Sequence, residues 1–441
     1  MLKTIQNAWR LPELRKKILF TLLVIIVFRI GAVIPVPFLN VSALQGLMES
    51  VNESGNMLAY LNTLSGGAFA NATLFAMSVT PYINASIIMQ LLAVAIPPLE
   101  RMAKEGEEGR KKIATITRYA TVVLGLIQGT GYYFYLRNSK FEGKSIVMYT
   151  NGGEAVFTAI VIIMVFTAGT AMMMWLGEQI NQYGVGNGIS ILLFAGIVSR
   201  MPTMIGKLVA YFNLAMESPA SNGKYYFLVP LFIVLFLAVI VVIVFMNDAE
   251  RRIPIQYAKR VVGRKMYGGQ NSHIPIKVGL AGVMPIIFAS TFLSIPDTIN
   301  LFVNPTGVWK TILDACSSGG WVYSIVYFLL IIMFAYFYVA IQYNPIEMAN
   351  NLRQNNGTIP GIRPGKPTAE FISKVLSKIT LIGALFLAFI ALLPIIFGAT
   401  TGMQNMSLGG TSLIILVGVA LETVKQMESQ MMMRHYKGFL D

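Results

Sequence analysis

The sequence is poor in charged side chains. Asp, Glu, Lys and Arg make up 12% of its 441 residues, about half the share of roughly 25% found in soluble domains. This scarcity excludes an ordinary cytosolic enzyme. The single cysteine, Cys316, excludes an internal disulfide. The two histidines, His273 and His435, lie outside the apolar runs, so a proton relay inside a membrane has no evident members.

Residue patterns for catalysis or cofactor binding are also missing from the sequence. The cluster of Gly184, Gly186 and Gly188 has neither the Lys-Ser/Thr pair nor the preceding strand that a phosphate-binding loop requires. A turn is the better interpretation of these glycines. The sequence shows no Ser/His/Asp set and no cluster of metal ligands. We therefore predict no catalytic residue, no metal site and no cofactor.

Long apolar runs dominate the sequence instead. Hydrophobic residues make up 55% of the chain, and ten stretches of about 20 residues can each cross a hydrocarbon core of about 30 Å as a helix. The sequence therefore predicts an all-α, polytopic membrane protein with ten transmembrane helices. The predicted spans are 18–38, 74–97, 113–136, 154–177, 186–206, 225–247, 276–296, 320–343, 371–397 and 408–427.

The first apolar run is interpreted as a membrane span and not as a removable signal. It follows Lys16 and Lys17, is interrupted by Arg29, and lacks a cleavage site of small residues. Arg29 is the clearest charge inside a span. Its side chain either snorkels toward water or pairs with another group of the structure, and the sequence leaves both readings open.

The basic residues are unevenly distributed between the two sides of the membrane. Most of the 34 Lys and Arg residues fall in segments on the side of both termini, and such segments stay in the cytoplasm. We therefore expect a multi-pass membrane protein with both termini cytoplasmic. Anionic lipid headgroups alone explain such an excess, but the loops 248–275 and 344–370 are far longer than tight helix connections. Their length and charge favour docking surfaces.

Small and polar residues occur at unexpected places in the apolar runs. The segment Leu61–Asn71, with Ser65 and two glycines, is too short to cross a membrane and forms either a loop cap or a re-entrant stopper. The second span carries Thr80, Asn84 and Gln90, and Pro285 lies near the start of the seventh. These residues suit close helix packing, and they equally suit two helices that must separate.

Nine ordered motifs make the chain resemble a known family between about residue 8 and residue 435. The motifs are Phe28-Arg29-Ile30-Gly31 with Ile34-Pro35, Ser65-Gly66-Gly67-Ala68, Pro81-Tyr82-Ile83 through Gln90, Lys104-Glu105-Gly106 through Arg118-Tyr119, Trp175-Leu176-Gly177-Glu178-Gln179-Ile180, Gly186-Asn187-Gly188-Ile189-Ser190, Arg251-Arg252-Ile253-Pro254 with Gln256-Tyr257-Ala258-Lys259-Arg260, Pro360-Gly361-Ile362-Arg363-Pro364-Gly365, and Gly409-Gly410-Thr411-Ser412. In these motifs the chain resembles the SecY family, the channel-forming subunits of the bacterial Sec protein translocase.

The resemblance implies a fold and a pore. It implies two inverted five-helix halves, 1–212 and 213–441, around an hourglass channel with a re-entrant plug helix at about 61–71. In the family, six aliphatic side chains form a ring at the waist, where walls without hydrogen-bonding groups close a narrow pore by excluding water. The matching positions are Ile83, Ile87, Ile189, Leu193, Ile287 and Ile415. Leu193 stands where isoleucine is more usual.

The resemblance also assigns residues to moving parts and docking surfaces. It implies a plug containing Ser65, Gly66, Gly67, Ala68 and Phe69, and a lateral gate containing Thr80, Asn84, Gln90 and Pro285. The implied docking residues for the motor ATPase SecA or for the ribosome, including ribosomal RNA, are Arg251, Arg252, Lys259, Arg260 and Arg363. Two positions depart from the family pattern: Phe38 replaces a frequent glycine, and Asn355-Asn356 replaces a more basic stretch.

The resemblance therefore predicts a passive, gated protein-conducting channel for unfolded secretory polypeptides and for apolar membrane segments. It implies the partners SecE and SecG, the engines SecA and the ribosome, and contact with anionic lipids. Two other classes remain open from the residues alone: a small-solute secondary transporter with inverted repeats, and a membrane scaffold without a conduit. The scarcity of charge inside the spans argues against the transporter.

Overall fold

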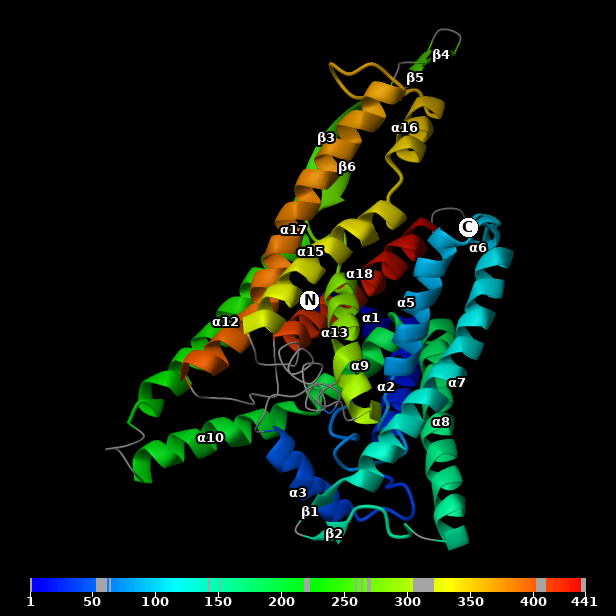
Figure 1. Ribbon diagram of the computed structural model, residues 1–441. Helices are drawn as coiled ribbons and strands as arrows, with labels where there is room; N and C mark the ends of the chain where they lie inside the picture. Colours follow the sequence, from blue (N-terminus) through cyan, green and yellow to red (C-terminus); the bar gives the residue numbers. More distant parts are fainter. Residues whose placement is uncertain are drawn as a thin grey trace.

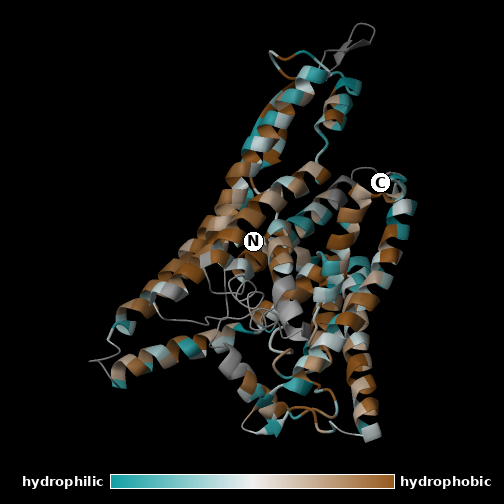
Figure 2. Cartoon of the chain, viewed as in Figure 1, coloured by the Kyte–Doolittle hydropathy of each residue, from teal (hydrophilic) through white to brown (hydrophobic). Residues whose placement is uncertain are grey.

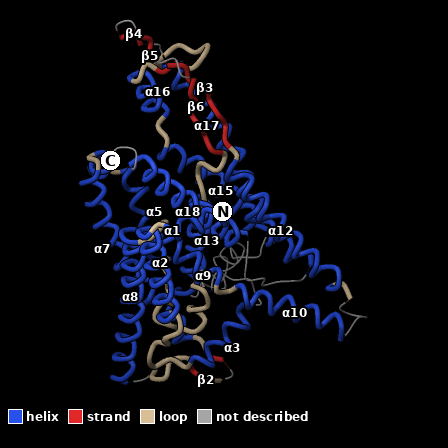
Figure 3. The backbone as a smooth tube through the Cα atoms, turned by 180° about the vertical axis from the view of Figure 1, so that it is seen from behind, coloured by secondary structure: helices blue, strands red, loops and turns tan. Residues whose placement is uncertain are grey.

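The computed structural model describes residues 2–52, 62, 65–141, 143–150, 152–217, 223–257, 260–262, 265–267, 271–303, 321–401 and 410–437. Figure 1 shows long helices running between two ends of the molecule. The upper end carries strands β3 to β6 and helix α16, and the lower end carries α3 with strands β1 and β2. Figure 3, seen from behind, shows the described strands at these same two ends with helices between them.

Helices make up most of the described chain. The first 217 residues contain α1 (Leu2–Arg10), α2 (Pro12–Gly31), α3 (Val41–Asn52), α5 (Thr80–Ala95), α6 (Pro97–Lys104), α7 (Glu107–Asn138), β1 (Lys140–Phe141), β2 (Lys144–Ser145), α8 (Gly152–Tyr183), α9 (Gly188–Val198) and α10 (Met201–Glu217). The remainder contains α12 (Tyr225–Asp248), β3 (Glu250–Tyr257), β4 (Arg260–Val262), β5 (Lys265–Tyr267), β6 (Asn271–Lys277), α13 (Met284–Val303), α15 (Trp321–Gln342), α16 (Pro345–Gln354), β7 (Gly357–Thr358), α17 (Lys366–Thr401) and α18 (Gly410–Lys437).

Within the described residues, five helices are long and apolar enough to cross a membrane. They are Gly152–Tyr183, Gly188–Glu217, Tyr225–Asp248, Val322–Gln354 and Lys366–Gly398, and the bent pair α5–α6 would make a sixth. Each of the ten predicted spans overlaps a helix. The count of ten stays a prediction, since a helix such as α2 also carries Arg15, Lys16, Lys17 and Arg29 within its 20 residues.

The apolar helices turn much of their surface outward. Only 22% of the most apolar window of α12 is buried by the rest of the chain, so most of its Val, Ile, Leu and Phe side chains face the surroundings. A soluble monomer does not expose apolar surface on this scale, whereas hydrocarbon surroundings accept it. Figure 2 shows hydrophobic residues concentrated on these helices and hydrophilic residues gathered around α16 and α6.

Two predicted spans begin later than expected. Residues 65–79, before α5, form turns and an isolated bridge, so the span predicted from residue 74 becomes helical only at Thr80. The span predicted from residue 276 becomes helical only at Met284, because β6 and a turn come first. Pro81 and Pro285 each occupy the first turn of their helix, where a missing N–H costs nothing.

Two of the apolar runs are broken along their length. The axis turns by 107° between α5 and α6, because Pro97 and Pro98 follow Ile96 and end the helix. The fifth predicted span is divided at Ser199 and Arg200 into α9 and α10. Helix α10 continues to Glu217, so the expected boundary between residues 212 and 213 falls inside it. A boundary after α10 fits the secondary structure better.

The predicted loop 248–275 is a β-hairpin. Strands β3 and β6 pair antiparallel, with Arg251 opposite Ile276. Ile253 and Ile255, two residues apart on β3, are buried with Ile276 in a core shared with α16 and α17. Pro254 fits into β3 because β7 pairs only with the far end of that strand, which leaves an open edge at the proline.

The turn after α2 holds the first departure from the family pattern. Phe38 has a φ of 66°, a left-handed conformation that a bulky side chain rarely adopts. Its ring contacts Tyr149 and Phe157 in edge-on geometry, and its carbonyl accepts a hydrogen bond from the Met148 amide at 3.1 Å. These contacts hold the strained residue in place.

The irregular stretch 65–79 packs against α8 at a glycine. A Cβ atom at Gly169 would collide with the backbone carbonyl of Leu74. Leu74 is itself held in place, because its amide donates a hydrogen bond to the Ile34 carbonyl at 3.0 Å. We expect Gly169→Ala to lower the free energy of unfolding by about 1–3 kcal/mol through overpacking. The measurement is the thermal unfolding temperature of the purified protein in detergent.

Gly153→Ala is the matched control for this prediction. Gly153 lies in the first turn of α8 and has open space where its Cβ would be. Unfolding of both variants at the same temperature would contradict the proposed close contact.

Candidate functional site

The six ring positions come from four helices. Ile83 and Ile87 lie one helical turn apart on α5, Ile189 and Leu193 one turn apart on α9, and the last two are Ile287 on α13 and Ile415 on α18. Side chains four residues apart share one face of a helix. Helix α9 packs against α18, which brings two of these faces together.

The six side chains lie in two adjoining apolar clusters. Leu193 and Ile415 are 4% and 2% exposed in the first cluster, and Ile87 is 7% exposed in the second. Ile83 and Ile287 pack against both clusters. The aliphatic side chains therefore belong to one continuous apolar core to which α5, α9, α13 and α18 all contribute.

The Ser65–Phe69 turn packs against two clusters. Ala68 is 1% exposed within the first cluster, whereas Phe69 is 2% exposed in a third cluster, where it stacks on Tyr132 of α7 at 4.3 Å between ring centroids. The Tyr132 hydroxyl donates a hydrogen bond to the Phe69 carbonyl at 2.7 Å. The turn is thereby anchored to α7, and its Ala68 side chain packs in the cluster that contains Leu193 and Ile415.

Of the predicted plug, residues 61–71, the structure describes residue 62, which is helical, and residues 65–71, which form consecutive turns. Local bonds hold these turns: the Ser65 hydroxyl accepts a hydrogen bond from the Phe69 amide at 3.0 Å, and the Asn62 side-chain oxygen accepts one from the Ala70 amide at 3.1 Å. Gly66 and Gly67 adopt φ values of 66° and 91°, which break a right-handed helix.

Two arginines converge on the glycine turn. A Cβ atom at Gly66 would lie 2.9 Å from an Nη of Arg29, and one at Gly67 would lie 3.0 Å from an Nη of Arg200. One guanidinium nitrogen of each arginine is buried without a hydrogen-bond partner among the described residues. The sequence left open whether the Arg29 side chain snorkels toward water or meets another group of the structure. In the structure it faces the glycine turn. Arg200 was missed, because it follows the apolar stretch of α9 and resembles an ordinary outer-loop charge.

An ion pair joins two neighbouring helices close to the core. Arg118 of α7 and Glu178 of α8 approach to 2.7 Å between Nε and Oε1. The two residues are 60 positions apart, so no local pattern predicts that they pair. The pair neutralises two charges that would each be costly inside a membrane.

The predicted gate residues lie on two helices: Thr80, Asn84 and Gln90 on α5, and Pro285 on α13. Helix α13 packs against α7, and α7 packs against α5. Gln90 donates to the Ser86 hydroxyl at 3.4 Å within α5, and Pro285 is buried at the start of α13. Thr80 is half-buried, and the side-chain oxygen of Asn84 is buried without a partner among the described residues. A polar atom left unpaired there raises the energy of the packed seam.

The predicted docking residues lie at the upper end of the molecule. Arg251 and Arg252 are exposed on β3, and Arg252 pairs with Glu250 at 2.7 Å. Arg260 belongs to β4 at the tip, and Lys259 lies outside the described residues. Arg363 is exposed in the loop before α17, between Gly361 and Gly365, whose φ values are 80° and 98°.

The second departure from the family pattern lies beside this loop. Asn356 has a φ of 54° and donates its amide to the Arg353 carbonyl at the end of α16. Asparagine tolerates this left-handed conformation well. The residue therefore has a structural role in ending α16.

A family model matches most of the chain. The model describes SecY, and it matches residues 73–424. The chain belongs to the SecY family. Among curated relatives, the protein translocase subunit SecY of Bacillus subtilis is 45% identical over 445 residues and that of Streptomyces coelicolor 44% identical over 447 residues, each with both chains fully covered.

Solved structures share the fold. A structure described as that of a protein conducting channel matches with a TM-score of 0.64 and 17% identity over 96% of both chains. Sec61 in the canine ribosome-channel complex matches with a TM-score of 0.61 and 17% identity, also over 96% of both chains. The resemblance seen in the sequence is confirmed: the chain is a multi-pass membrane protein of a family of translocase channel subunits, which are not enzymes.

The glycine turn offers a test of how tightly it is held. A Cβ at Gly66 would lie 2.6 Å from the Ser199 hydroxyl and 2.9 Å from the Gly196 carbonyl. We expect Gly66→Ala to displace the turn by overpacking, and to increase ion leakage of reconstituted vesicles about fivefold or more.

Gly143→Ala separates crowding from backbone strain. Gly143 has a φ of 77°, close to that of Gly66, but open space around its Cβ position. Leakage that rises equally in both variants, or in neither, would show that this contact does not seat the turn.

Proposed function

We propose that the chain is a passive, gated channel for polypeptides, which pass across the membrane unfolded or leave the pore sideways as apolar segments. The observation that carries the proposal is the shared core of the six aliphatic side chains, with the Ser65–Phe69 turn resting on it. A core that belongs to four helices at once is suited to open when those helices separate.

The resting pore is closed in this proposal by exclusion of water. Isoleucine and leucine offer no hydrogen bond to water or to a hydrated ion, so a narrow ring of them stays dry. A polypeptide can still pass, because flexible aliphatic side chains fit around different residues and make no bond that must be broken. The plug adds a second barrier. Its seat combines apolar contacts with hydrogen bonds from Tyr132 to the Phe69 carbonyl and from the Ser199 hydroxyl to the Gly66 carbonyl.

In this proposal the chain acts as two inverted halves of five spans each, expected from the sequence as 1–212 and 213–441, with the boundary placed after α10, which ends at Glu217. The seam between α5 with α7 and α13 with α15 is the lateral gate. Two observations support a gate whose closed state is only weakly stabilised: α13 packs on α7, and the side-chain oxygen of Asn84 has no hydrogen-bond partner among the described residues. An apolar segment in the pore leaves through it because transfer into hydrocarbon is favourable.

The upper end is the cytoplasmic docking surface in this proposal. Solved structures with a similar fold include Sec61 in the canine ribosome-channel complex and the idle yeast Ssh1 complex bound to the yeast ribosome. We propose that Arg251, Arg252, Lys259 and Arg260 meet the ribosome, including the phosphates of ribosomal RNA. Arg363 transmits the action of SecA, and Gly361 and Gly365 hold its loop in a fixed shape.

The chain works in an assembly according to the same proposal. SecE clamps the two halves, SecG joins them, and both termini lie in the cytoplasm beneath the plasma membrane. Anionic lipid headgroups meet the basic segments that flank the spans. The substrates are secretory and membrane polypeptides with signal sequences.

The ring gives the decisive test of the channel. We expect Ile87→Asn combined with Ile287→Asn to increase ion leakage of vesicles containing the resting channel, because two amides at the constriction hold water there. The measured quantity is the rate of ion flux through vesicles without a translocating substrate.

Conservative exchange at the same positions is the control. Ile87→Leu with Ile287→Leu keeps the walls apolar, and Leu193 already occupies one ring position. Unchanged leakage in the asparagine variant would count against the ring. Counterflow of a small solute through the unmodified chain would instead favour a secondary transporter.

Arg363 gives a test of the motor contact. We expect Arg363→Glu to reduce ATP-driven export several-fold, since a reversed charge repels the acidic groups that an exposed arginine attracts, and to leave ribosome-coupled insertion near its normal rate. The two rates are measured on the same proteoliposomes.

Arg353→Glu makes the same charge change on neighbouring α16 and controls for the net charge of the protrusion. Export that is equally retained in both variants, or insertion lost together with export, would remove the assignment of Arg363 to the motor.

A further inference from the structure

Two arginine side chains from different elements meet at one turn of the backbone. Arg29 lies near the end of α2, and Arg200 lies at the junction of α9 and α10. An added Cβ atom would lie 2.9 Å from an Nη of Arg29 at Gly66, and 3.0 Å from an Nη of Arg200 at Gly67. The two guanidinium groups therefore flank the same two-residue segment, and each carries a permanent positive charge.

These two charges have no negative partner in the described part of the chain. Neither arginine belongs to any of the ion pairs found there. Nη1 of Arg29 and Nε of Arg200 are buried and have no hydrogen-bond acceptor among the described residues. A buried donor without an acceptor is costly, and two like charges close together raise the cost further. A negatively charged acceptor between them would lower both costs.

The turn leaves room for such an acceptor on one side. At Gly66, an added Cβ would lie 2.6 Å from the Ser199 hydroxyl and 2.9 Å from the Gly196 carbonyl, so that side is filled. The Ser199 hydroxyl already donates to the Gly196 and Gly66 carbonyls, at 2.6 Å and 3.4 Å. At Gly67, which is buried, the three atoms nearest to an added Cβ all belong to Arg200. The open side of the turn therefore faces the Arg200 side chain.

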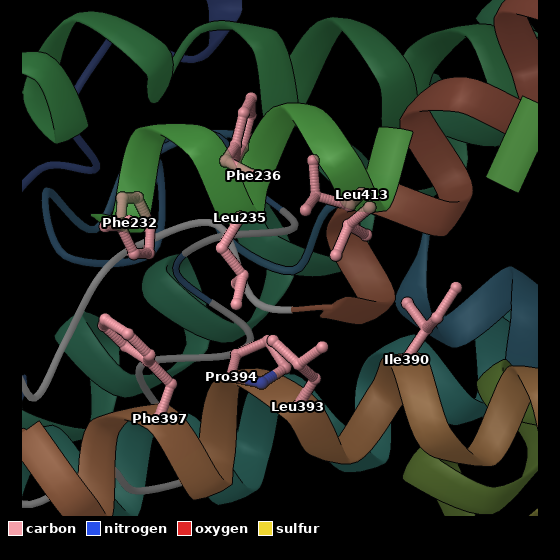
Figure 4. A pocket seen from close by; sticks show the side chains of 9 residues that line it. Phe232, Leu235, Phe236, Ile390, Leu393, Pro394, Phe397 and Leu413 are labelled. Atoms are coloured by element: carbon pink, nitrogen blue, oxygen red, sulfur yellow. The ribbon is translucent and has the colours of Figure 1, made fainter. Parts of the chain in front are cut away.

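The cavity between α12, α17 and α18 offers nothing comparable. Figure 4 shows side chains of α12 and α18 facing those of α17 across it, and all the side chains that line it are apolar. Its volume is about 20 Å³, enough for about one water molecule. Apolar walls give an ion no ligand, so the arginines at the glycine turn are the better candidate for a binding site.

We propose that Arg29, Arg200 and the open side of Gly67 form a binding site for one small monovalent anion, namely chloride. The ion accepts hydrogen bonds from the guanidinium groups and balances part of their charge. Burial of Gly67 and crowding at Gly66 favour an ion of a single atom over a phosphate headgroup or the carboxylate of a polypeptide, which both need more space. The bound ion links α2 and the α9–α10 junction to the turn.

The test measures the unfolding temperature of the full-length protein, purified in detergent with its bound subunits, at a fixed ionic strength. Sodium chloride is compared with sodium bromide, a second small anion, and with sodium gluconate, whose anion is too large for the site. A ligand that binds only the folded state stabilises it, so we expect chloride and bromide to raise the unfolding temperature by about 2 °C or more. The increase should saturate with concentration. Equal unfolding temperatures in the three salts would overturn the proposal.

Single substitutions locate the ion. Arg29→Gln and Arg200→Gln should each remove most of the dependence on chloride, whereas Arg137→Gln, at an exposed arginine near the end of α7, should keep it. In gluconate, Arg200→Gln should unfold at the temperature of the parent or above it, because the variant lacks a partly buried charge without a partner. In chloride it should unfold below the parent. A chloride effect that survives in both glutamine variants of the site would refute it.

Gly67→Ala tests the space beside the turn. Its methyl group would occupy the open side next to Arg200, and we expect the dependence on chloride to fall. The φ of Gly67 is 91°, so alanine is also strained there; Gly143→Ala, with a φ of 77° and open space, shows the effect of strain alone. Equal dependence on chloride in both variants would contradict the placement of the ion.

Crystals of the unmodified protein soaked in bromide give a direct measurement that needs no variant. We expect an anomalous scattering peak beside the Arg200 guanidinium, and its absence would overturn the proposal. None of these measurements uses a translocating substrate, so their outcome is independent of the proposed channel function.

Discussion

The structure depends on one constraint: irregular backbone at membrane depth must find its hydrogen bonds inside the protein. The stretch 65–79 meets this constraint between the helices. Ser65 and Asn62 bond the amides of the turn, and Tyr132 reaches the Phe69 carbonyl from α7. Bonds to distant segments complete this arrangement: the Val36 amide donates to the Ala72 carbonyl, the Leu74 amide to the Ile34 carbonyl, and the Ser199 hydroxyl to the Gly66 carbonyl.

The same apolar side chains serve both stability and closure. In a soluble protein, a core that several helices share is simply the interior. Here Ile83 and Ile287 pack against both clusters, so separation of the helices would open the core along a line between them. Packing of aliphatic groups has no preferred direction, which lets such a core re-form after it has been opened.

The charged residues that are proposed to contact partners lie at one end of the molecule. The hairpin β3–β6 has its own small core of isoleucines against α16 and α17, and it carries the exposed Arg251 and Arg252. Inside the helical region, Arg118 is paired with Glu178. Arg29 and Arg200 lie against the glycine turn, and one guanidinium nitrogen of each has no hydrogen-bond partner among the described residues.

The sequence by itself determined the class of protein, the order of its apolar helices and its family. These follow from local composition and spacing: a run of 20 apolar residues is visible without knowledge of its neighbours. Tertiary structure alone decided that residues 65–71 are turns, that the loop 248–275 is a hairpin, and that Arg200 lies beside Gly67. Ile83 and Ile87 share a helix face in any fold, but contact with α9, α13 and α18 depends on how helices far apart in the sequence pack, and no local pattern encodes that packing.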